Sequence, residues 1–344
     1  MDGVPRIRFR ERQIEMAHGA GGKATRRLVD GLFAPLLLES PEYLGDAAQV
    51  QMDGIRIALT TDSFVVTPLQ FPGGSIGELA VNGTVNDLAV SGAKAEAMVV
   101  TFVLEAGLPA DVLEAEVRAM GQAARTAGVA IVGGDTKVVE HGKTDQMYVT
   151  TSAVGRLLPG VTLAPRSVRV GDRILLSGPI GDHGITILLA RGELDLEADL
   201  RSDTRSVLPL VEAVVKVAAA DLRWMRDPTR GGVATSLNEL ALDCGLGICL
   251  YEERLPVRDE VRGACELLGL DPLHIANEGQ FLAVVGPDSA DQALAALRAA
   301  PGGDGAEMIG EVRAQPAACV LVETGYGGSR IVDMLVGDPL PRIC

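Results

Sequence analysis

Residues 76–91 read IGELAVNGTVNDLAVS, and this stretch decides the fold of the first half of the chain. Its apolar residues fall on nearly every side at helical spacing, which predicts a helix buried all round. The carboxylate of Asp87 lies in line with Ile76, Ala80 and Gly83 on that helix. A buried charged group is costly unless a partner compensates it, so Asp87 requires a cation or several hydrogen-bond donors.

A divalent ion is the most economical partner for Asp87, because Mg²⁺ takes carboxylate oxygens and bridges them to phosphates. Three further aspartates occur beside predicted strands, at 49–52, 55–61 and 129–132, and ligand sites often form at the ends of such elements. The alternatives are turn-capping aspartates and, for Asp87, backbone N–H groups or an arginine. The predicted metal ligands are Asp46, Asp62, Asp87 and Asp135.

Two glycine-rich stretches predict phosphate binding. Residues 17–25 read AHGAGGKAT just before a helical pattern, so backbone N–H groups and a helix start favour an anion, with a flexible turn as the alternative. Residues 133–137 read GGDTK, whose glycines permit close backbone approach to phosphate and whose lysine meets its charge. The residues assigned to the nucleotide in this half are Gly19, Gly21, Gly22, Lys23, Thr61, Asn86, Gly133, Gly134, Asp135 and Thr136.

The second half restarts with a predicted strand at 173–177 and a glycine-rich turn that contains His183, which is interpreted as structural or as an acid or base. Residues 225–232 read MRDPTRGG at the head of another helix, where Asp227, Thr229 and Arg230 are predicted to bind the cofactor and to receive the chain terminus. Glu278 lies in an Asn-Glu-Gly loop. The pattern there fits either a carboxylate facing a cleft or a simple turn.

Length and composition describe a large globular protein. The 344 residues suggest two domains, predicted at 1–163 and 164–322, with a tail at 323–344. The net charge of −15 repels polyanions, which argues against nucleic acid and anionic membranes as partners but does not forbid ATP. No apolar run approaches membrane-spanning length, and five cysteines without zinc-type spacing favour a reducing cytoplasm.

Cys344 is the last residue, at the end of a tail loosened by glycines. A cysteine thiol has a pKa of about 8.5, so little of it is thiolate near neutrality, and the adjacent terminal carboxylate lowers that fraction further. Such a mobile thiol suits a covalent carrier to which a partner attaches an activated group. The alternative is an incidental cysteine in a frayed end.

Six motifs together closely resemble the HypE family of [NiFe]-hydrogenase maturation factors. The resemblance runs from about Met16 to the last residue. Three of the motifs are shared with aminoimidazole ribonucleotide synthetase, selenophosphate synthetase and thiamine-phosphate kinase, whereas the terminal one marks the HypE branch. The motifs are TTDS at 60–63, NGTVNDLAVSGA at 82–93, GGDTK at 133–137, DPTRGG at 227–232, NEG at 277–279 and PRIC at 341–344.

The resemblance implies an α/β (α+β) protein with a two-domain PurM-like fold, each domain an antiparallel sheet covered by helices, and a flexible tail. It implies a homodimer formed through the first domain's sheet, with ATP near the interface. It also implies that a HypF-type carbamoyltransferase loads Cys344, that ATP and Mg²⁺ support dehydration of the thiocarbamate to a thiocyanate, and that a HypC-HypD complex accepts the cyano group.

The residue types suit this chemistry. Carboxamide oxygen is a poor leaving group, and phosphorylation by ATP converts it to phosphate before loss of the N–H protons leaves a nitrile. The predicted catalytic residues are Cys344 as carrier, Glu278 for proton removal and Lys137 for phosphate charge. The rival hypotheses are a small-molecule kinase or synthetase with an incidental Cys344, and a non-catalytic cyanide carrier.

Overall fold

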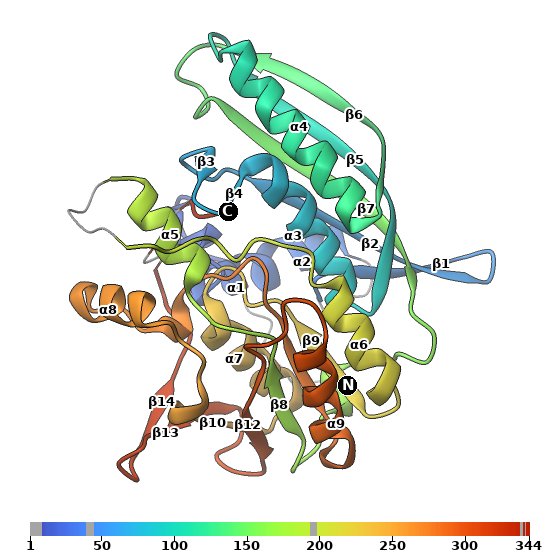
Figure 1. Cartoon of the computed structure of the whole chain (residues 1–344), viewed down its shortest axis with the longest axis vertical. Helices are drawn as coiled ribbons and strands as arrows, with labels where there is room; N and C mark the ends of the chain where they lie inside the picture. Colours follow the sequence, from blue (N-terminus) through green and yellow to red (C-terminus); the bar gives the residue numbers. More distant parts are fainter. Residues whose placement is uncertain (1–8, 39–44, 193–197, 338–339, 341) are drawn as a thin grey trace.

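The computed structural model describes residues 9–38, 45–192, 198–337, 340 and 342–344. Helix α3 (Ile76–Val90) is confirmed as a buried helix, because every residue in it except Glu78 and Asp87 is buried. It follows the extended residue Ser75 and lies between the two halves of the molecule (Figure 1). The near-uniform apolar character of the segment therefore reflects contact on all sides.

The first domain is built on one five-stranded sheet, and its helices α3 and α4 (Ala110–Ala127) pack on one face (Figure 1). The strand order is β1-β2-β7-β5-β6. Three neighbouring pairs are antiparallel, but β5 and β6 run parallel, so the prediction of a wholly antiparallel sheet is wrong for this pair. The reason is that α4 crosses over between them. The strands are β1 (Ala48–Met52), β2 (Ile55–Phe64), β5 (Ala93–Glu105), β6 (Ala130–Val139) and β7 (Met147–Leu157).

The second domain has a seven-stranded sheet in the order β14-β13-β10-β12-β8-β11-β9. It too departs from the antiparallel prediction at one pair, β10 and β13, which are parallel. Alternate residues of its strands pack against α7 on one face and against α6 and α9 on the other, so helices cover both faces. The strands are β8 (Arg173–Leu176), β9 (Leu222–Arg226), β10 (Gly247–Tyr251), β11 (Leu282–Val285), β12 (Glu307–Arg313), β13 (Cys319–Glu323) and β14 (Ser329–Val332).

The remaining elements are short or connect the two sheets. Helix α6 begins at Leu208, and Pro209 occupies its first turn. These elements are η1 (Met16–Gly19), α1 (Lys23–Leu28), η2 (Val29–Phe33), α2 (Ala34–Leu37), β3 (Gln70–Phe71), β4 (Gly74–Ser75), η3 (Pro165–Ser167), α5 (Asp182–Ala190), α6 (Leu208–Ala218), α7 (Gly232–Cys244), η4 (Glu252–Arg254), α8 (Asp259–Leu268), η5 (Pro272–His274) and α9 (Pro287–Ala299).

The stretch predicted as a tail, residues 323–344, is only partly separate from the second domain. Strand β14 lies within it and pairs antiparallel with β13. The chain then returns to the region between the domains (Figure 1), where Leu340 and Ile343 are buried and Cys344 is hydrogen-bonded to Val65 just after β2. In this structure, therefore, the terminal residues are packed against the protein.

Candidate active site

Three aspartates from three different elements converge between the domains. Asp46 precedes β1, Asp87 lies on α3 and Asp227 directly follows β9. Each offers one carboxylate oxygen, and these oxygens lie within 4.8 Å of one another. Such a cluster of hard oxygen donors is the ligand type that Mg²⁺ prefers.

The charges of this cluster are poorly compensated by the protein itself. Burial raises the pKa of Asp87 and Asp227 well above the ordinary aspartate range, and repulsion from neighbouring carboxylates adds to the effect. Thr60 Oγ1 donates to Asp87 Oδ2 at 2.8 Å, and Arg226 Nε lies 2.8 Å from Asp46 Oδ1. A cation bound among these oxygens would relieve the repulsion, so the residues fit the metal that the family resemblance implies.

Asp227 was predicted to bind the cofactor or the tail, whereas the structure puts it among the candidate metal ligands. Sequence reasoning missed this because the aspartate reads as a helix-capping residue of DPTRGG. Asp62, on β2, is close enough to raise the pKa of Asp87 and Asp227 by repulsion, but it is not one of the three converging residues.

Glu278 faces the same group of acids from the second domain. Its side chain is buried, and its Oε1 atom has no hydrogen-bond partner among the described residues. Burial raises its pKa well above the ordinary range, with repulsion from Asp62 and Asp227 adding to the shift and attraction to Arg230 opposing it. The sequence pattern left open whether Glu278 faces a cleft or only forms a turn, and its buried position beside Asp62 and Asp227 favours a role in a site.

Asp203 holds the Glu278 loop and was not found from the sequence. Its carboxylate accepts hydrogen bonds from the backbone N–H groups of Glu278, at 3.0 Å, and Gly279, at 3.2 Å. A Cβ at Gly279 would lie 1.7 Å from the Asp203 carbonyl oxygen, so only glycine fits there. Nothing local in the sequence pairs positions 75 residues apart.

Asn86, predicted to bind the cofactor, is used by the protein to join its domains. Its amide nitrogen donates to the carbonyl oxygens of Arg205, at 2.9 Å, and Glu278, at 3.1 Å. Its amide oxygen accepts the Val207 N–H at 2.8 Å. Asn86 therefore anchors α3 to the loop that carries Glu278.

The glycine loop at 19–23 packs against the second domain near the acids. Arg230 Nη1 donates to the Gly19 carbonyl oxygen at 3.2 Å, and a Cβ at Gly21 would lie 2.6 Å from the Arg230 carbonyl oxygen. A Cβ at Gly22 would lie 2.2 Å from the Leu335 carbonyl oxygen, and Lys23 forms an ion pair with Asp333. Thr229 lies at the start of α7, where its carbonyl oxygen accepts the Gly232 N–H at 2.9 Å.

Asp135 and Lys137 lie away from the cluster within one chain. Both are exposed on β6, and Lys137 Nζ is 2.7 Å from Asp135 Oδ2. The strand register connects Asp135 through Thr101 and Thr150 to Ser63 on β2, which is three strand spacings or about 14 Å. Within a single chain, Asp135 is therefore too far from β2 to join the other predicted metal ligands.

The other residues predicted around them take part in the sheet. A Cβ at Gly134 would lie 1.9 Å from the Val100 carbonyl oxygen, whereas Gly133 has open space beside it. The Thr136 N–H donates to Asp135 Oδ1 at 2.8 Å. Thr61 Oγ1 donates to the Thr151 carbonyl oxygen at 3.1 Å. In one chain these residues shape the exposed surface of the sheet.

Cys344 is half-buried and lies beside the end of β2. Its backbone carboxylate oxygen accepts a hydrogen bond at 3.0 Å from the N–H of Val65, which lies three residues beyond Asp62. Arg342, which adopts a left-handed backbone conformation with φ of 58°, donates to the Val65 carbonyl oxygen at 3.2 Å and forms an ion pair with Asp145. The terminal cysteine is thus fixed just beyond the strand that carries Asp62, the acid beside the cluster.

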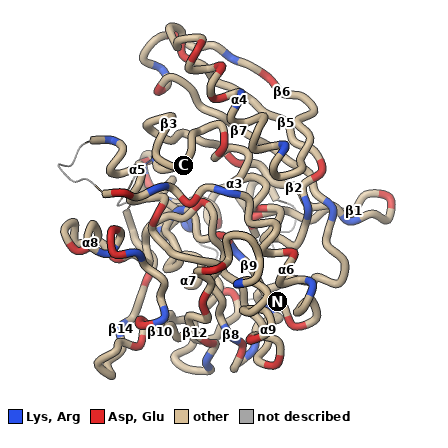
Figure 2. Tube along the Cα trace, viewed as in Figure 1, with Lys and Arg blue, Asp and Glu red and all other residues tan. Residues whose placement is uncertain are grey.

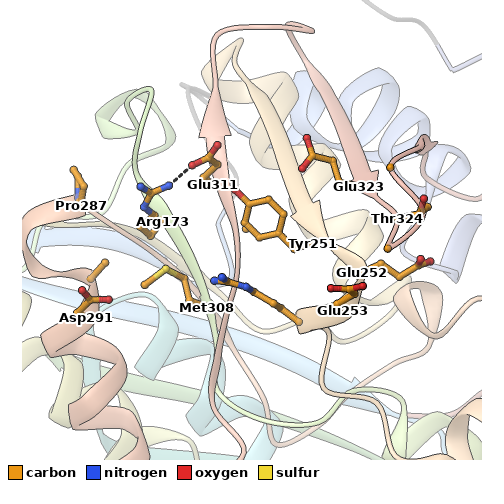
Figure 3. Close-up of a pocket in the computed structure, with 15 residues that line it drawn as sticks. Arg173, Tyr251, Glu252, Glu253, Pro287, Asp291, Met308, Glu311, Glu323 and Thr324 are labelled. Atoms are coloured by element: carbon orange, nitrogen blue, oxygen red, sulfur yellow. Dashed lines mark hydrogen bonds and ion pairs between the residues drawn. The ribbon is translucent and has the colours of Figure 1, made fainter.

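A separate cavity of about 760 Å³ lies in the second domain, near the loop after β13. Figure 3 shows Tyr251 and Glu323 at its wall and the ion pair between Arg173 and Glu311. None of the predicted site residues lines it. The acid cluster, not this cavity, is therefore the candidate active site.

Comparison with known proteins defines the class first. Residues 44–157 match the family model for the N-terminal domain of AIR synthase related proteins, and residues 169–322 match the model for their C-terminal domain. The chain is 49% identical over 342 residues to a carbamoyl dehydratase HypE of Azotobacter vinelandii, covering 99% of this chain and 100% of that protein. It is 44% identical to the HypE of Escherichia coli K12, covering 96% of this chain and 99% of that protein. The chain belongs to the HypE carbamoyl dehydratase family.

Solved structures agree with this membership. A HypE-HypF complex contains a chain with a TM-score of 0.84 and 43% identity, covering 90% of this chain and 99% of that one. A HypE structure in complex with ATP has a TM-score of 0.80 and 44% identity, covering 96% of this chain and 99% of that one. The two-domain PurM-like fold expected from the sequence is confirmed.

None of the described helices has the length and apolar character needed to cross a bilayer. Figure 2 shows acidic residues over both domains, as the net charge of −15 requires.

Proposed function

We propose that this protein is an ATP-dependent carbamoyl dehydratase that converts a carbamoyl group on its own Cys344 to a thiocyanate in hydrogenase maturation. The observation that carries the proposal is the docking of Cys344 on Val65, next to the strand that bears Asp62. The family membership supports the reaction, and the HypE relative solved with ATP supports the nucleotide. The substrate and the active site would then belong to the same chain.

The acids between the domains are the proposed metal ligands. Asp46, Asp87 and Asp227 would hold Mg²⁺, with Asp62 beside them. When bound, the ion would neutralise phosphate charge and orient ATP for transfer to the carboxamide oxygen. The Gly19–Lys23 loop, together with Thr229 and Arg230, would contact the nucleotide, because the loop and Arg230 pack together close to Asp62.

Glu278 is the proposed proton acceptor. Transfer of the γ-phosphoryl group to the carboxamide oxygen, with loss of one N–H proton, produces an imidate phosphate and ADP. Elimination of phosphate with loss of the second N–H proton produces the nitrile. A buried carboxylate with a raised pKa and one unpartnered oxygen is suited to accept such a proton.

A homodimer formed through the first domain's sheet would complete this site. The face of that sheet opposite α3 and α4 exposes large apolar side chains, including Val50 at 41%, Leu59 at 47% and Val99 at 43%. Asp135 and Lys137 lie on the same face, since they pair in register with Thr101 and Val103. Covering this face with a second copy would bury the apolar residues and bring its Lys137 and Asp135 toward the acids.

Two further partners follow from the family. The solved HypE-HypF complex supports a HypF-type carbamoyltransferase as the donor that loads Cys344. The resemblance also implies a HypC-HypD complex as acceptor of the cyano group. A nucleic acid partner is not proposed, because the net charge of −15 repels a polyanion.

The test uses the intact protein carrying a carbamoyl group on Cys344. After incubation with ATP and Mg²⁺, mass spectrometry of the C-terminal peptide should show loss of one water, and Cys344→Ser should carry no such modification. An unchanged carbamoyl mass would overturn the proposal. Turnover of ATP that is unaffected by Cys344→Ser would instead support the alternative, a small-molecule kinase or synthetase.

A further inference from the structure

The last residues of the chain are held from the second domain by helix α5. His183 is fully buried on this helix, and its Nε2 atom lies 2.6 Å from the carbonyl oxygen of Ile343. Arg191, just beyond the end of α5, donates from Nη2 to the carbonyl oxygen of Arg342 at 2.7 Å. Two consecutive peptide carbonyls before Cys344 are therefore bound by side chains of α5 and of the residue that caps its end.

The hydrogen bonds define the state of the His183 ring. The Ile343 carbonyl can only accept, so Nε2 carries the hydrogen and donates. Burial lowers the pKa of His183 to about 4, so the ring is neutral and Nδ1 must accept. Ser202 Oγ lies 2.8 Å from Nδ1 and itself accepts the Thr204 N–H at 3.1 Å, so the serine hydroxyl donates to the ring.

The first domain holds the same residues from the other side. The Val65 N–H donates to the Cys344 backbone carboxylate oxygen at 3.0 Å, and Arg191 Nε donates to the Thr67 carbonyl oxygen at 3.0 Å. Ile343 is 5% exposed, so its carbonyl is shielded from water and depends on His183 for its hydrogen bond. The chain terminus is thus clamped between β2 and α5.

We propose that His183, supported by Arg191, is a positioning residue that locks the terminal peptide into the interdomain site and so sets both the dehydration rate and the access of reagents to Cys344. This inference rests on the proposed function for its catalytic part only. Neither side chain belongs to the proposed metal or nucleotide residues. The lock should favour the intramolecular reaction, because it pre-orients the reacting group, and should oppose attack on the thiol from outside.

The test compares His183→Ala, Arg191→Gln and His183→Gln in the full-length protein. Loss of the lock should slow dehydration of carbamoylated Cys344 by about tenfold or more, because a poorly held group reaches the reactive geometry less often. The same loss should speed alkylation of unmodified Cys344 by iodoacetamide about threefold or more, measured on the C-terminal peptide. His183→Gln should restore both rates substantially, because its amide N–H replaces the Nε2 donor.

The control is His274→Ala, in the same domain, since His274 makes no hydrogen bond to residues 340 or 342–344 among the described contacts. Affinity for ATP should stay the same in every variant. Slower dehydration without faster alkylation, in both His183→Ala and Arg191→Gln, would overturn the proposal in favour of a purely structural role. If the unmodified protein fails to dehydrate at all, the proposed function fails, while the alkylation rates still test the lock.

Discussion

The carboxyl group of Glu278 is surrounded by other acids and leaves one buried oxygen unpartnered among the described residues. A buried polar atom without a partner is costly, and a catalytic role or a bound ligand is one explanation for retaining it. Its two neighbours in the loop, Asn277 and Gly279, are both committed to structure, because Asn277 Oδ1 accepts the Gly181 N–H and Gly279 donates to Asp203. Of these three loop residues, Glu278 is therefore the one whose side chain keeps an oxygen available for a ligand or a proton.

Replacing Glu278 with Gln should slow dehydration about 10²- to 10⁴-fold, the range expected when a general base is removed. Affinity for ATP should change little, because the side chain keeps its size. The measurement is the single-turnover rate of water loss from carbamoylated Cys344. Glu116→Gln is the control, because Glu116 is as buried but is hydrogen-bonded to Gln70 and Gly77. A rate within about twofold of the parent protein would exclude Glu278 as the base.

The acid cluster should make metal-free protein less stable as the pH rises. The folded-state pKa of Asp87 and Asp227 is raised, so the stability that their protonated forms contribute is complete below about pH 4, the unfolded value, and is lost as the pH rises through the folded value. Asp87→Asn should therefore raise Tm by a few degrees at about pH 8 in EDTA. This shift corresponds to an increase in the free energy of unfolding on the order of 1 kcal/mol.

Magnesium should remove the advantage in Tm that Asp87→Asn has over the parent protein in EDTA. Added Mg²⁺ should raise the Tm of the parent protein but not that of Asp87→Asn, because the variant has lost a ligand of the cluster. Differential scanning fluorimetry across pH, with and without the ion, measures both effects. Asp172→Asn is the control, since Asp172 is also buried but accepts from Arg169 outside the cluster. Equal responses of both variants to Mg²⁺ would remove Asp87 from the metal site.

At the scale of elements, α3 is the helix against which both domains are built. It packs on the first sheet and on α4, and Asn86 ties it to the second domain. Two glycines let its neighbours approach closely. A Cβ at Gly83 would lie 2.9 Å from the Phe64 ring, and one at Gly77 would lie 2.2 Å from the carbonyl oxygen of Glu116 on α4. The spacing of α3 from its neighbours thus depends on these two positions.

Gly77→Ala should destabilise the protein by about 1–3 kcal/mol, because the added methyl group collides with backbone that has no room to move. Gly121→Ala, on α4, should be neutral or stabilising by up to about 1 kcal/mol, since a Cβ there meets only Arg125 Nη1, at 3.4 Å. Urea unfolding compares the two variants. Equal stabilities would show that α3 and α4 can separate without cost.

At the scale of the whole molecule, the open face of the first sheet matters most. This face exposes apolar residues. It also carries Lys137 on β6, which lies three strand spacings, or about 14 Å, from β2. One chain therefore has the acids and the terminal cysteine in one place and Lys137 in another. A symmetric dimer would allow each site to use residues of both copies.

Co-expression of Lys137→Ala and Asp87→Asn chains tests such sharing. If each site takes Lys137 from the other copy, mixed dimers contain one intact site, and random mixing should restore about a quarter of the dehydration activity. Each variant alone should have little activity. The readout is water loss from carbamoylated Cys344 in the mixed sample. Activity no greater than the sum of the two separate variants would show that each chain uses its own Lys137.

Sequence patterns predicted the secondary structure well where the pattern was local. The buried helix at 76–91 and the strands at 49–52 and 55–61 follow from the spacing of apolar residues, which involves residues a few positions apart. The parallel pairs β5-β6 and β10-β13 and the strand at 329–332 did not follow, because strand order depends on packing across the whole domain.

By itself, the sequence determined the fold family, the acidic motifs and a cysteine at position 344, since residue identity and spacing are enough to recognise them. Only the tertiary structure decided that Asp227 joins Asp46 and Asp87 while Asp135 does not, and that His183 and Arg191 hold the chain terminus. The physical reason is that a ligand set is defined by distances of a few ångströms between side chains far apart in the chain. Those distances arise from strand register and domain packing, which no short stretch of sequence encodes.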